Sequence, residues 1–301
     1  MCSVMRFSVI FTVLVLTSFS VKATDIETYR GVVDVPGTPQ RIIAFPAGVV
    51  DTLDALGVKL VGMPAGIHLN YIDQNQASEV GTLFTADLEA IHRLQPDLVV
   101  VGTRSAKQFE SVAEIAPTVD LSLARGNTYQ AAIQRMNDLA RLFDKAEQAK
   151  TIEHELTQLR DQVAASVSKT GSVMVVMVIG RSLNMLTAKT RIDWFQSELG
   201  MTLVGDDSKQ LGELAPISFE YILAQNPDWL IVMDRDAAVG KPSSNAQQQM
   251  NNPLVNATTA AQKGQIVYLD GVGTLNAVGG VQGLRNTLQQ LEQAFNDPSR
   301  F

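Results

Sequence analysis

Residues 88–104 read LEAIHRLQPDLVVVGTR, and residues 219–235 read FEYILAQNPDWLIVMDR. The two stretches share a glutamate near the start, a Pro-Asp pair in the middle and an arginine at the end, and each matching pair lies 131 residues apart. Both read as a short helix, a turn and a buried aliphatic strand. One helix–turn–strand unit therefore occurs twice, which predicts two lobes of similar architecture.

Other apolar runs with the character of buried strands lie on both sides of these units. They are short, rich in β-branched residues and bounded by Gly, Pro, Asp or Asn; with the strands of the two units they comprise Ile42–Phe45, Leu98–Val101, Val173–Ile179, Leu230–Met233 and Ile266–Leu269. Amphipathic stretches such as Val49–Leu56 and Ala86–Leu94 separate them. Strands that alternate with helices predict parallel sheets of βα units, and hence an α/β fold.

The segment between the two units, residues 129–168, has helical periodicity and contains neither glycine nor proline. An unbroken helix of this length would be roughly 60 Å long. We expect one long helix to join an N-terminal lobe of residues 24–128 to a C-terminal lobe of residues 169–301, with two Rossmann-like lobes and a ligand cleft between them. The alternative is a pair of consecutive helices with a bend near Asp144.

Arg104 and Arg235 follow the strands of the two units. Ligands of parallel α/β sheets bind beyond the carboxyl ends of the strands, so both arginines should point into the cleft if the sheets face each other. Guanidinium groups stay charged and bind flat arrays of oxygen atoms, which favours an anionic ligand. The shared glutamates, Glu89 and Glu220, lie at the other end of the preceding helices, and we expect them away from the cleft.

The N-terminus has the pattern of a secretory signal peptide. Arg6 precedes an apolar run, Phe7–Leu16, and small and polar residues follow up to Ala23. The run is too short to anchor the chain in a bilayer, so we expect cleavage after Ala23 and export from the cytoplasm. A buried N-terminal helix or strand is the alternative. Cys2 precedes the run, so it would be lost with the signal and could not carry a lipid anchor.

Composition excludes several classes of function. Cys2 is the only cysteine, so the exported protein would have no thiol for a disulfide, a zinc–thiolate site or a cysteine nucleophile. The net charge of −7 becomes −9 when Arg6 and Lys22 leave with the signal peptide. An acidic chain of this kind is a poor candidate for binding nucleic acid or an anionic membrane surface.

Two other motifs give weak signals. His68, His92 and His154 do not have the spacing of metal ligands, so a direct zinc or manganese binder is not expected, and only His68 lies in a loop from which it could reach a site. Residues 271–276, GVGTLN, imitate the start of a dinucleotide fingerprint but lack its third glycine and its acidic residue. We interpret them as a loop of the cleft.

The chain after the signal resembles the helical-backbone class of periplasmic binding proteins, which serve importers of siderophores, haem and vitamin B12. The Pro-Asp–strand unit repeated around a central helix carries this resemblance. Three further stretches, DRDAAVG at 234–240, NPLV at 252–255 and GQIVYLD at 264–270, are similar to the subgroup that binds catecholate-type ferric siderophores, including enterobactin-, petrobactin- and anguibactin-like complexes. The resemblance implies an anionic iron(III)–siderophore complex as the ligand, and no cofactor.

In that subgroup three arginines converge on the chelate, and by position they correspond to Arg104, Arg191 and Arg235. A ferric tris-catecholate carries roughly three negative charges, which such a cluster could balance. Aromatic side chains could cover the flat faces of the ligand, so we expect Phe45 and Trp194 to form walls of the cleft.

Lys107 and Asn276 complete the ligand-binding set that we predict. In the family resembled, a glutamate on each lobe contacts one subunit of the permease dimer, and Glu89 and Glu220 occupy the corresponding places. Some relatives bind iron directly through a histidine and a tyrosine, but the corresponding positions here fall near Glu213 and near residues 273–275 and hold neither side chain. This departure favours a chelate that satisfies the iron by itself, or one that uses another donor such as Glu213.

The sequence thus predicts a non-catalytic, monomeric binding protein of the periplasm that delivers a ferric siderophore to an ABC permease dimer in the inner membrane. Haem or cobalamin is the alternative ligand within the same class. A secreted α/β enzyme is the alternative of a different class, but the sequence has no nucleophile elbow, no paired His and carboxylate and no zinc motif to support it.

Overall fold

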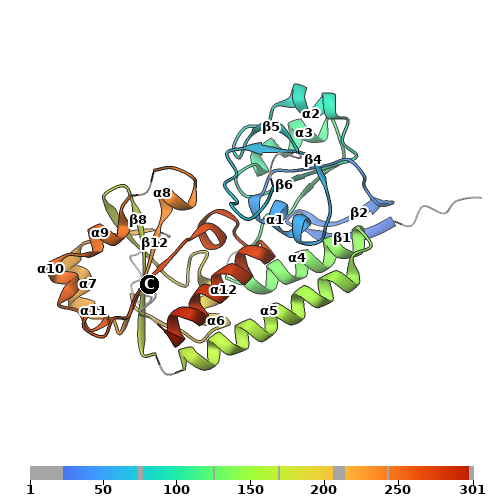
Figure 1. Ribbon diagram of the computed structural model, residues 1–301. Coiled ribbons are helices and arrows are strands. Elements are labelled where there is room, and N and C mark those ends of the chain that lie inside the picture. Colours follow the sequence, from blue (N-terminus) through green and yellow to red (C-terminus); the bar gives the residue numbers. More distant parts are fainter. Residues whose placement is uncertain are drawn as a thin grey trace, which may run out of the picture.

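The computed structural model describes residues 23–73, 77–124, 126–168, 170–205, 214–242 and 244–297. Two α/β lobes lie side by side, and helices that run along one side of the molecule connect them (Figure 1). The predicted two-lobed α/β fold is confirmed. The predicted signal peptide, up to residue 22, and Glu213 lie outside the described residues. Among the described helices, none is both long enough and apolar enough to cross a membrane.

The N-terminal lobe contains a parallel sheet and a separate hairpin. The hairpin pairs β1 (Ala23–Thr28) with β2 (Gly31–Pro36). The five-stranded parallel sheet has the order β5 (Ser78–Thr82), β4 (Leu60–Ala65), β3 (Ile42–Ala44), β6 (Leu98–Val101) and β7 (Thr118–Asp120). Its helices are α1 (Ala47–Ala55), α2 (Leu88–Leu94) and α3 (Phe109–Ala113), with a 3-10 helix at Ala106–Gln108.

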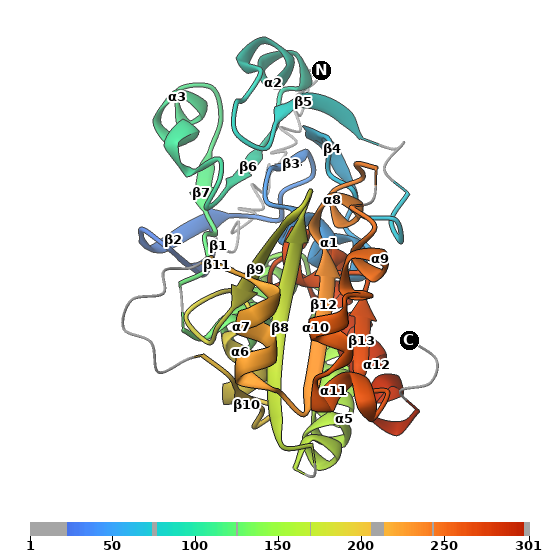
Figure 2. The same cartoon turned by 90° about the vertical axis from the view of Figure 1, so that its left-hand side faces the viewer.

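The C-terminal lobe contains a mixed sheet, in the order β11 (Ala215–Ile217), β9 (Ser182–Leu186), β8 (Ser172–Ile179), β12 (Trp229–Asp234) and β13 (Ile266–Leu269), with β10 (Thr202–Leu203) also beside β8. The helices α7 (Phe219–Gln225), α10 (Pro253–Asn256) and α11 (Thr259–Gln262) lie in front of the sheet in Figure 2, as does α9 (Ala246–Met250) near its edge. The shorter helices α6 (Asp193–Ser197) and α8 (Arg235–Ala238) also belong to this lobe.

The expectation of a purely parallel sheet is wrong for this lobe. Strand β9 runs antiparallel to β8, because Ile179 pairs with Ser182 and the chain reverses within the two residues between them. Gly180 occupies this turn with a φ of 56°, a left-handed conformation that glycine adopts without steric cost. The strands β8, β12 and β13 are parallel, as predicted.

The repeated unit folds in the same way in both lobes. Helix α2 ends at Gln95 and helix α7 at Asn226, and both capping residues are left-handed with a φ of 44°. The aspartate of each Pro-Asp pair then anchors the start of a neighbouring strand: Asp97 accepts from the backbone N–H of Arg41 at 2.8 Å, just before β3, and Asp228 accepts from that of Ser172 at 3.0 Å, in β8. The Pro-Asp pair therefore fixes the central strand of each sheet.

The expectation of one long helix is wrong, and the alternative with two helices is correct. Helix α4 (Thr128–Leu142) and helix α5 (Ala146–Val167) are separated by a turn in which Asp144 has a φ of 54°. Asn137 donates to Glu153 at 3.0 Å across the pair, so the two helices form an antiparallel hairpin (Figure 1). The turn lets Leu142 and Phe143 enter the core, where both are buried.

Helix α5 runs from the N-terminal lobe to the C-terminal lobe, and the last helix, α12 (Val281–Asn296), lies beside it (Figure 1). Near the start of α5, the side-chain amide of Gln148 donates to the carbonyl of Ala55, at the end of α1, at 2.6 Å. Further along, Arg160 lies 3.5 Å from Glu198, which belongs to the C-terminal lobe. Arg285 of α12 pairs with Glu155 of α5 at 2.7 Å. Both helices therefore contribute to the junction between the lobes.

One apolar cluster runs through this junction. It contains Ile42 and Leu98 of the N-terminal sheet, Ile231 and Val173 of the C-terminal sheet, and the buried faces of α4, α5 and α12. Strand residues on the other face of the C-terminal sheet, such as Met174 in β8, belong to a separate cluster under the outer helices. The two lobes thus share a core on one side, and this close packing holds them in a fixed arrangement relative to each other.

Candidate ligand-binding cleft

A cleft of about 250 Å³ lies between the lobes. The N-terminal lobe lines it with segments that follow β3, β6 and β7, namely Phe45, Pro46, Ala47, Gly48, Gly102, Thr103, Arg104, Ser105, Leu121, Leu123 and Ala124, and with Leu83. Helix α4 contributes Thr128 and Arg135, and the C-terminal lobe contributes Leu186, Lys189, Thr190, Arg191, Leu214, Asn276 and Val278. In the N-terminal lobe the cleft therefore lies at the carboxyl ends of the parallel strands, as predicted.

The C-terminal lobe follows this rule only in part. Arg235 comes directly after β12, but Arg191 lies in the loop between β9 and α6. Strand β9 is antiparallel to β8, so the loop that carries Arg191 follows a strand that runs opposite to β8 and β12.

The charged residues that line the cleft are Arg104, Arg135, Lys189 and Arg191. Of the described residues in this lining, none is acidic. The cleft is therefore a local concentration of positive charge within an acidic chain of net charge −7. Such a site attracts an anion, and exclusion of water by a bound ligand strengthens that attraction.

The charges of the other predicted arginines act on Arg104 and on Arg191. Burial lowers the pKa of Arg191, and the charges of Arg104 and Arg235 lower it further. Burial likewise lowers the pKa of Arg104, with a further contribution from Arg235. Arg191 is held in place because its Nη1 donates to the carbonyl of Leu275 at 2.9 Å. The structure thus brings together charges that repel one another until an anion compensates them.

Arg235 differs from the other two arginines. Its side chain is 39% exposed and lies 3.5 Å from Asp236, the next residue along the chain. It is absent from the lining of the cleft, although its charge reaches both Arg104 and Arg191. Its assignment to the ligand-binding set stays a prediction.

The aromatic residues take different places from those expected. Phe45 lines the cleft but is only 1% exposed, so it does not present an open face to the cleft. The expectation that Trp194 forms a wall is wrong, because Trp194 is 2% exposed and packs edge-on against Phe195, with ring centroids 4.7 Å apart. Helix α6 begins at Asp193, two residues after Arg191, and its aromatic side chains are buried in the core. Lys107 is exposed in its 3-10 helix and is not part of the described lining.

Asn276 lines the cleft and also bridges the lobes. It ends a π-helix, Val272–Asn276, and its Nδ2 donates to the backbone carbonyl of His68 at 2.8 Å. The imidazole of His68 lies against Gly240 of the C-terminal lobe, where any Cβ would collide with the ring. Of the segment 271–276, which the sequence predicts to be a cleft loop, Asn276 lines the cleft, whereas residues 271–275 are absent from the lining and 272–276 form the π-helix. His68 is a contact between the lobes.

The sequence did not single out Lys189, Arg135 or Leu214 as cleft residues. Lys189 was detectable in principle, because it lies two positions before Arg191 in the same loop. Arg135 had no such signal, since a polar residue on a long amphipathic helix usually faces solvent. Its partners come from two other segments, at residue 121 after β7 and at residue 279 before α12.

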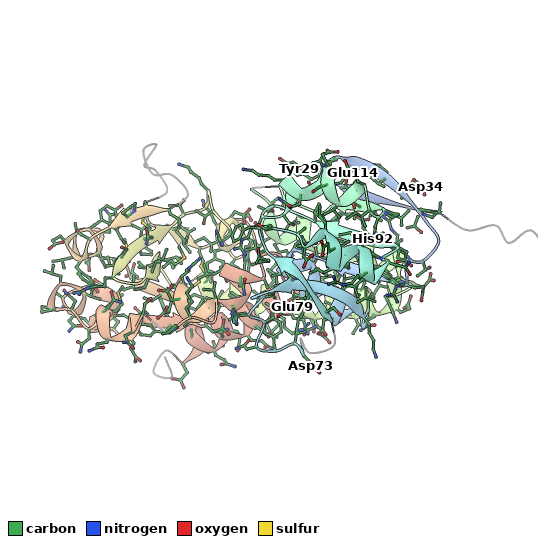
Figure 3. All side chains as sticks on the ribbon, turned by 90° about the horizontal axis from the view of Figure 1, so that it is seen from above. Tyr29, Asp34, Asp73, Glu79, His92 and Glu114 are labelled. Atoms are coloured by element: carbon green, nitrogen blue, oxygen red, sulfur yellow. The ribbon has the colours of Figure 1, made fainter. Side chains whose placement is uncertain are left out.

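The described part of the chain holds no cluster of three or more His, Cys, Asp or Glu side chains that could bind a metal ion. His92 and His154 are exposed, as expected. Figure 3 shows His92 on the outer surface of the N-terminal lobe.

Glu89 and Glu220 are both exposed in the first turn of their helices. Their helices begin after matching caps, in which Asp87 accepts from the N–H of Ala90 and Ser218 from that of Tyr221. The expectation that the glutamates lie away from the cleft is not supported, because cleft residues lie only five positions before each helix, at 83 and 214. A helix that leads into a parallel strand runs antiparallel to that strand, so it begins at the edge of the sheet where the strands end. Both glutamates are in the first turn of such a helix and therefore lie at this edge.

Known proteins match the chain over most of its length. The petrobactin-binding protein YclQ of Bacillus subtilis is 26% identical over 270 residues, which cover 87% of this chain and 84% of YclQ. The ferric-anguibactin-binding protein FatB of Vibrio anguillarum is 29% identical over 255 residues, which cover 81% of this chain and 79% of FatB.

The chain also resembles proteins of known structure over most of its length. The periplasmic catecholate-siderophore binding protein VctP from Vibrio cholerae superimposes with a TM-score of 0.80 and 28% sequence identity, over 90% of this chain and 99% of VctP. Residues 42–272 match the periplasmic binding protein family, and this segment contains both copies of the repeated unit and all three arginines. The chain therefore belongs to the periplasmic binding protein family.

Proposed function

We propose that this chain is the substrate-binding protein of an ABC importer and that it captures an anionic ferric siderophore of the catecholate type. The observation that carries the proposal is the cleft itself, whose described charged residues are all cationic. The names of the relatives support it, since they refer to petrobactin, ferric anguibactin and a catecholate siderophore. The iron belongs to the cargo, and no resident cofactor is needed for a binding role.

Arg104 and Arg191 would contact the chelate directly, because both line the cleft. Lys189 adds a fourth positive charge to those of Arg104, Arg135 and Arg191 in the lining. Lys107 and Arg235 would contribute from its surroundings. The side-chain amide of Asn276 also donates to the carbonyl of His68, so this hydrogen bond would fix its orientation toward the ligand. The described lining contains no His, Tyr, Asp or Glu, which supports a chelate that satisfies the iron without ligands from these segments.

Isothermal titration with the ferric complex of a synthetic tripodal tris-catecholate tests the ligand assignment. We expect saturable binding with one complex per protein chain, and much weaker binding of haem and cobalamin. The visible spectrum of the protein after mixing and gel filtration provides a second readout, because ferric catecholate and haem absorb at different wavelengths. Tight binding of haem without binding of the catecholate complex would transfer the assignment to the alternative ligand.

The cellular part of the proposal is export to the periplasm through a signal peptide cleaved after Ala23, with no lipid anchor, followed by docking of a monomer on a permease dimer. The family match supports a location outside the cytoplasm. Fractionation of expressing cells tests it: the mature protein should appear in the periplasmic extract, and its N-terminal residue should be Thr24. Recovery with the membrane in a detergent-soluble, lipid-modified form would contradict the absence of an anchor.

A further inference from the structure

Arg135 lies beneath the cleft and is almost removed from water, with 7% of its surface exposed. Its Nη2 donates to the carbonyl of Gly279 at 2.8 Å and its Nη1 to that of Leu121 at 3.2 Å. Its Nε is buried and has no hydrogen-bond partner. Burial lowers the pKa of Arg135 to about 10, so the group is still charged at neutral pH. The floor of the cleft therefore contains a fixed, poorly solvated positive charge.

Asp51, on α1, is the acidic residue that opposes this charge. It is fully buried and accepts from the hydroxyl of Tyr71 at 2.7 Å, the N–H of Gln282 at 2.8 Å and the N–H of Gly283 at 2.9 Å. The two charges interact over a distance, because the carboxylate is saturated by these donors and forms no ion pair with the guanidinium. Asp51 is also outside the lining of the cleft.

A glycine pair lies between the two charges. A Cβ on Gly279 would stand 3.2 Å from Nη2 of Arg135, and a Cβ on Gly280 would collide with the carboxylate of Asp51. Side chains there would push one group or the other out of place. The chain thus keeps Arg135 on the cleft side of this turn and Asp51 on the side of α12.

Water screens the partly exposed arginines of the cleft more than it screens Arg135. When a chelate fills the cleft, it faces the buried charge across a medium of low effective dielectric constant. One unit of charge acting over roughly 10 Å at an effective dielectric constant of about 20 corresponds to about a tenfold change in Kd. A charge of this kind changes the binding free energy in proportion to the charge of the ligand, whatever the shape of the ligand.

We propose that Arg135 is a specificity-determining residue of the cleft that selects chelates by their net negative charge, and that Asp51 sets how strongly the ligand experiences this charge. The inference rests on the proposed function and adds to it a property of the ligand, its charge. It assigns the role to two residues that need not touch the chelate.

Two complexes of one tripodal tris-catecholate provide the test, because iron(III) gives a trianion and titanium(IV) a dianion of nearly the same shape. The ratio of their dissociation constants reports the field in the cleft and cancels most effects of a change in shape or packing. Titrations at pH 8 and low ionic strength keep Asp51 ionised in the wild-type protein. The wild-type protein should bind the trianion more tightly than the dianion.

We expect Arg135→Met to reduce this preference roughly three- to tenfold, and Asp51→Asn to increase it by a similar factor, since it removes the opposing charge. Arg135→Lys keeps the charge and should preserve the preference. Arg160→Met is the matched control, because Arg160 is partly buried but lies outside the cleft lining. It should leave the preference unchanged.

The opposite signs separate this role from a structural one, because damage to the fold would weaken binding in both variants. An unchanged preference in a folded Asp51→Asn protein would overturn the inference, as would an unchanged preference in a folded Arg135→Met protein. If Arg135→Met does not fold, the Asp51→Asn and Arg135→Lys titrations still decide. If the wild-type protein binds neither complex, the proposed function fails instead, which is a distinguishable result.

Discussion

At the scale of single residues, the arginines of the cleft differ in what they should contribute. Loss of one charged hydrogen-bonding partner in a partly buried site costs about 1.5 to 3 kcal/mol, or roughly tenfold to a hundredfold in affinity. We expect Arg104→Gln and Arg191→Gln to fall in this range for the ferric tris-catecholate. Arg235→Gln should cost less, because this side chain is 39% exposed and already lies near Asp236.

Isothermal titration of the three single variants provides the measurement. Arg181→Gln is the control, since Arg181 is an exposed arginine of the C-terminal lobe outside the described lining. Unchanged affinity in all three variants would remove Arg104, Arg191 and Arg235 from the binding site.

Asp51 also predicts a dependence of stability on pH. Burial is the main cause that raises its pKa from 3.8 to about 6, against the opposing effect of its hydrogen bonds. The folded protein therefore holds this proton more tightly than the unfolded chain. The resulting stabilisation is fully present below pH 4 and is lost as the pH rises through 6, by about 2 to 3 kcal/mol in total.

Chemical denaturation of the wild-type protein and Asp51→Asn between pH 4 and pH 7.5 measures this contribution. The wild-type protein should lose about 2 to 3 kcal/mol more of its unfolding free energy over that interval than the variant does. Other carboxyl groups titrate in both proteins and cancel in the difference. Parallel curves for the two proteins would show that the pKa of Asp51 is not raised in the fold.

Single residues mark the limit of prediction from sequence. Arg104 was predictable because the repeat placed it after a strand, and Arg191 because it matched a family position. Trp194 lies three residues after Arg191, but the intervening turn starts a helix, and the sequence does not show which way that helix faces. Arg135 was not predictable, because its acceptors are backbone carbonyls of two other segments, which the helical pattern of α4 does not reveal.

At the scale of elements, the repeat predicted the strands β6 and β12 and their helices almost to the residue. Hydrophobic runs bounded by Gly, Pro and Asp carry this information locally. The hairpin of α4 and α5 was only the alternative, because Asp144 is the single local sign of a break in a segment without Gly or Pro. The sequence did not predict that β9 is antiparallel, because the direction of this strand depends on one two-residue turn.

The turn at Asp144 gives a prediction about stability. Asp144 is exposed and left-handed, with a φ of 54°, a conformation that costs a residue with a Cβ about 1 kcal/mol more than glycine. Asp144→Gly should therefore raise the unfolding free energy by about 0.5 to 1 kcal/mol.

The control for this variant is Gln158→Gly, at an exposed site inside α5. There glycine should lower the unfolding free energy by about 1 kcal/mol. Urea denaturation of both variants gives the two values. A loss of stability in Asp144→Gly as large as that in Gln158→Gly would indicate that the turn is not left-handed in solution.

At the scale of the whole molecule, the two lobes are joined by more than a single connection. The apolar cluster extends from one sheet through α4, α5 and α12 into the other sheet. Asn276 and His68 add a hydrogen bond across the cleft side. Opening the cleft would have to break these contacts together, whereas lobes that are joined only by extended segments can rotate about a few backbone angles.

We therefore expect the lobes to move little on binding. Small-angle X-ray scattering profiles of the protein with and without the ferric tris-catecholate should coincide within error. A clear fall in the radius of gyration on addition of the complex would contradict a shared core that holds the lobes. The test needs a ligand concentration well above Kd, which the titrations supply.

The repeat also makes a prediction about transport, because it places one exposed glutamate in the same position on each lobe. Glu89 and Glu220 lie in the first turns of α2 and α7, where an acidic residue stabilises the helix by about 0.3 to 1 kcal/mol through the helix dipole. That effect explains either glutamate alone. A protein with two similar lobes that docks on a dimeric permease needs one such contact per subunit, which would explain why both are present.

The double variant Glu89→Gln, Glu220→Gln should bind the ferric complex with wild-type affinity and transport it poorly in cells, because neither exposed side chain lines the cleft. Each single variant should show a smaller loss. Glu79→Gln, Glu114→Gln is the matched control, since both residues are exposed on the N-terminal lobe (Figure 3). Uptake of radiolabelled iron at native expression distinguishes the outcomes, and normal uptake by the double variant would leave the two glutamates with a role in helix stability alone.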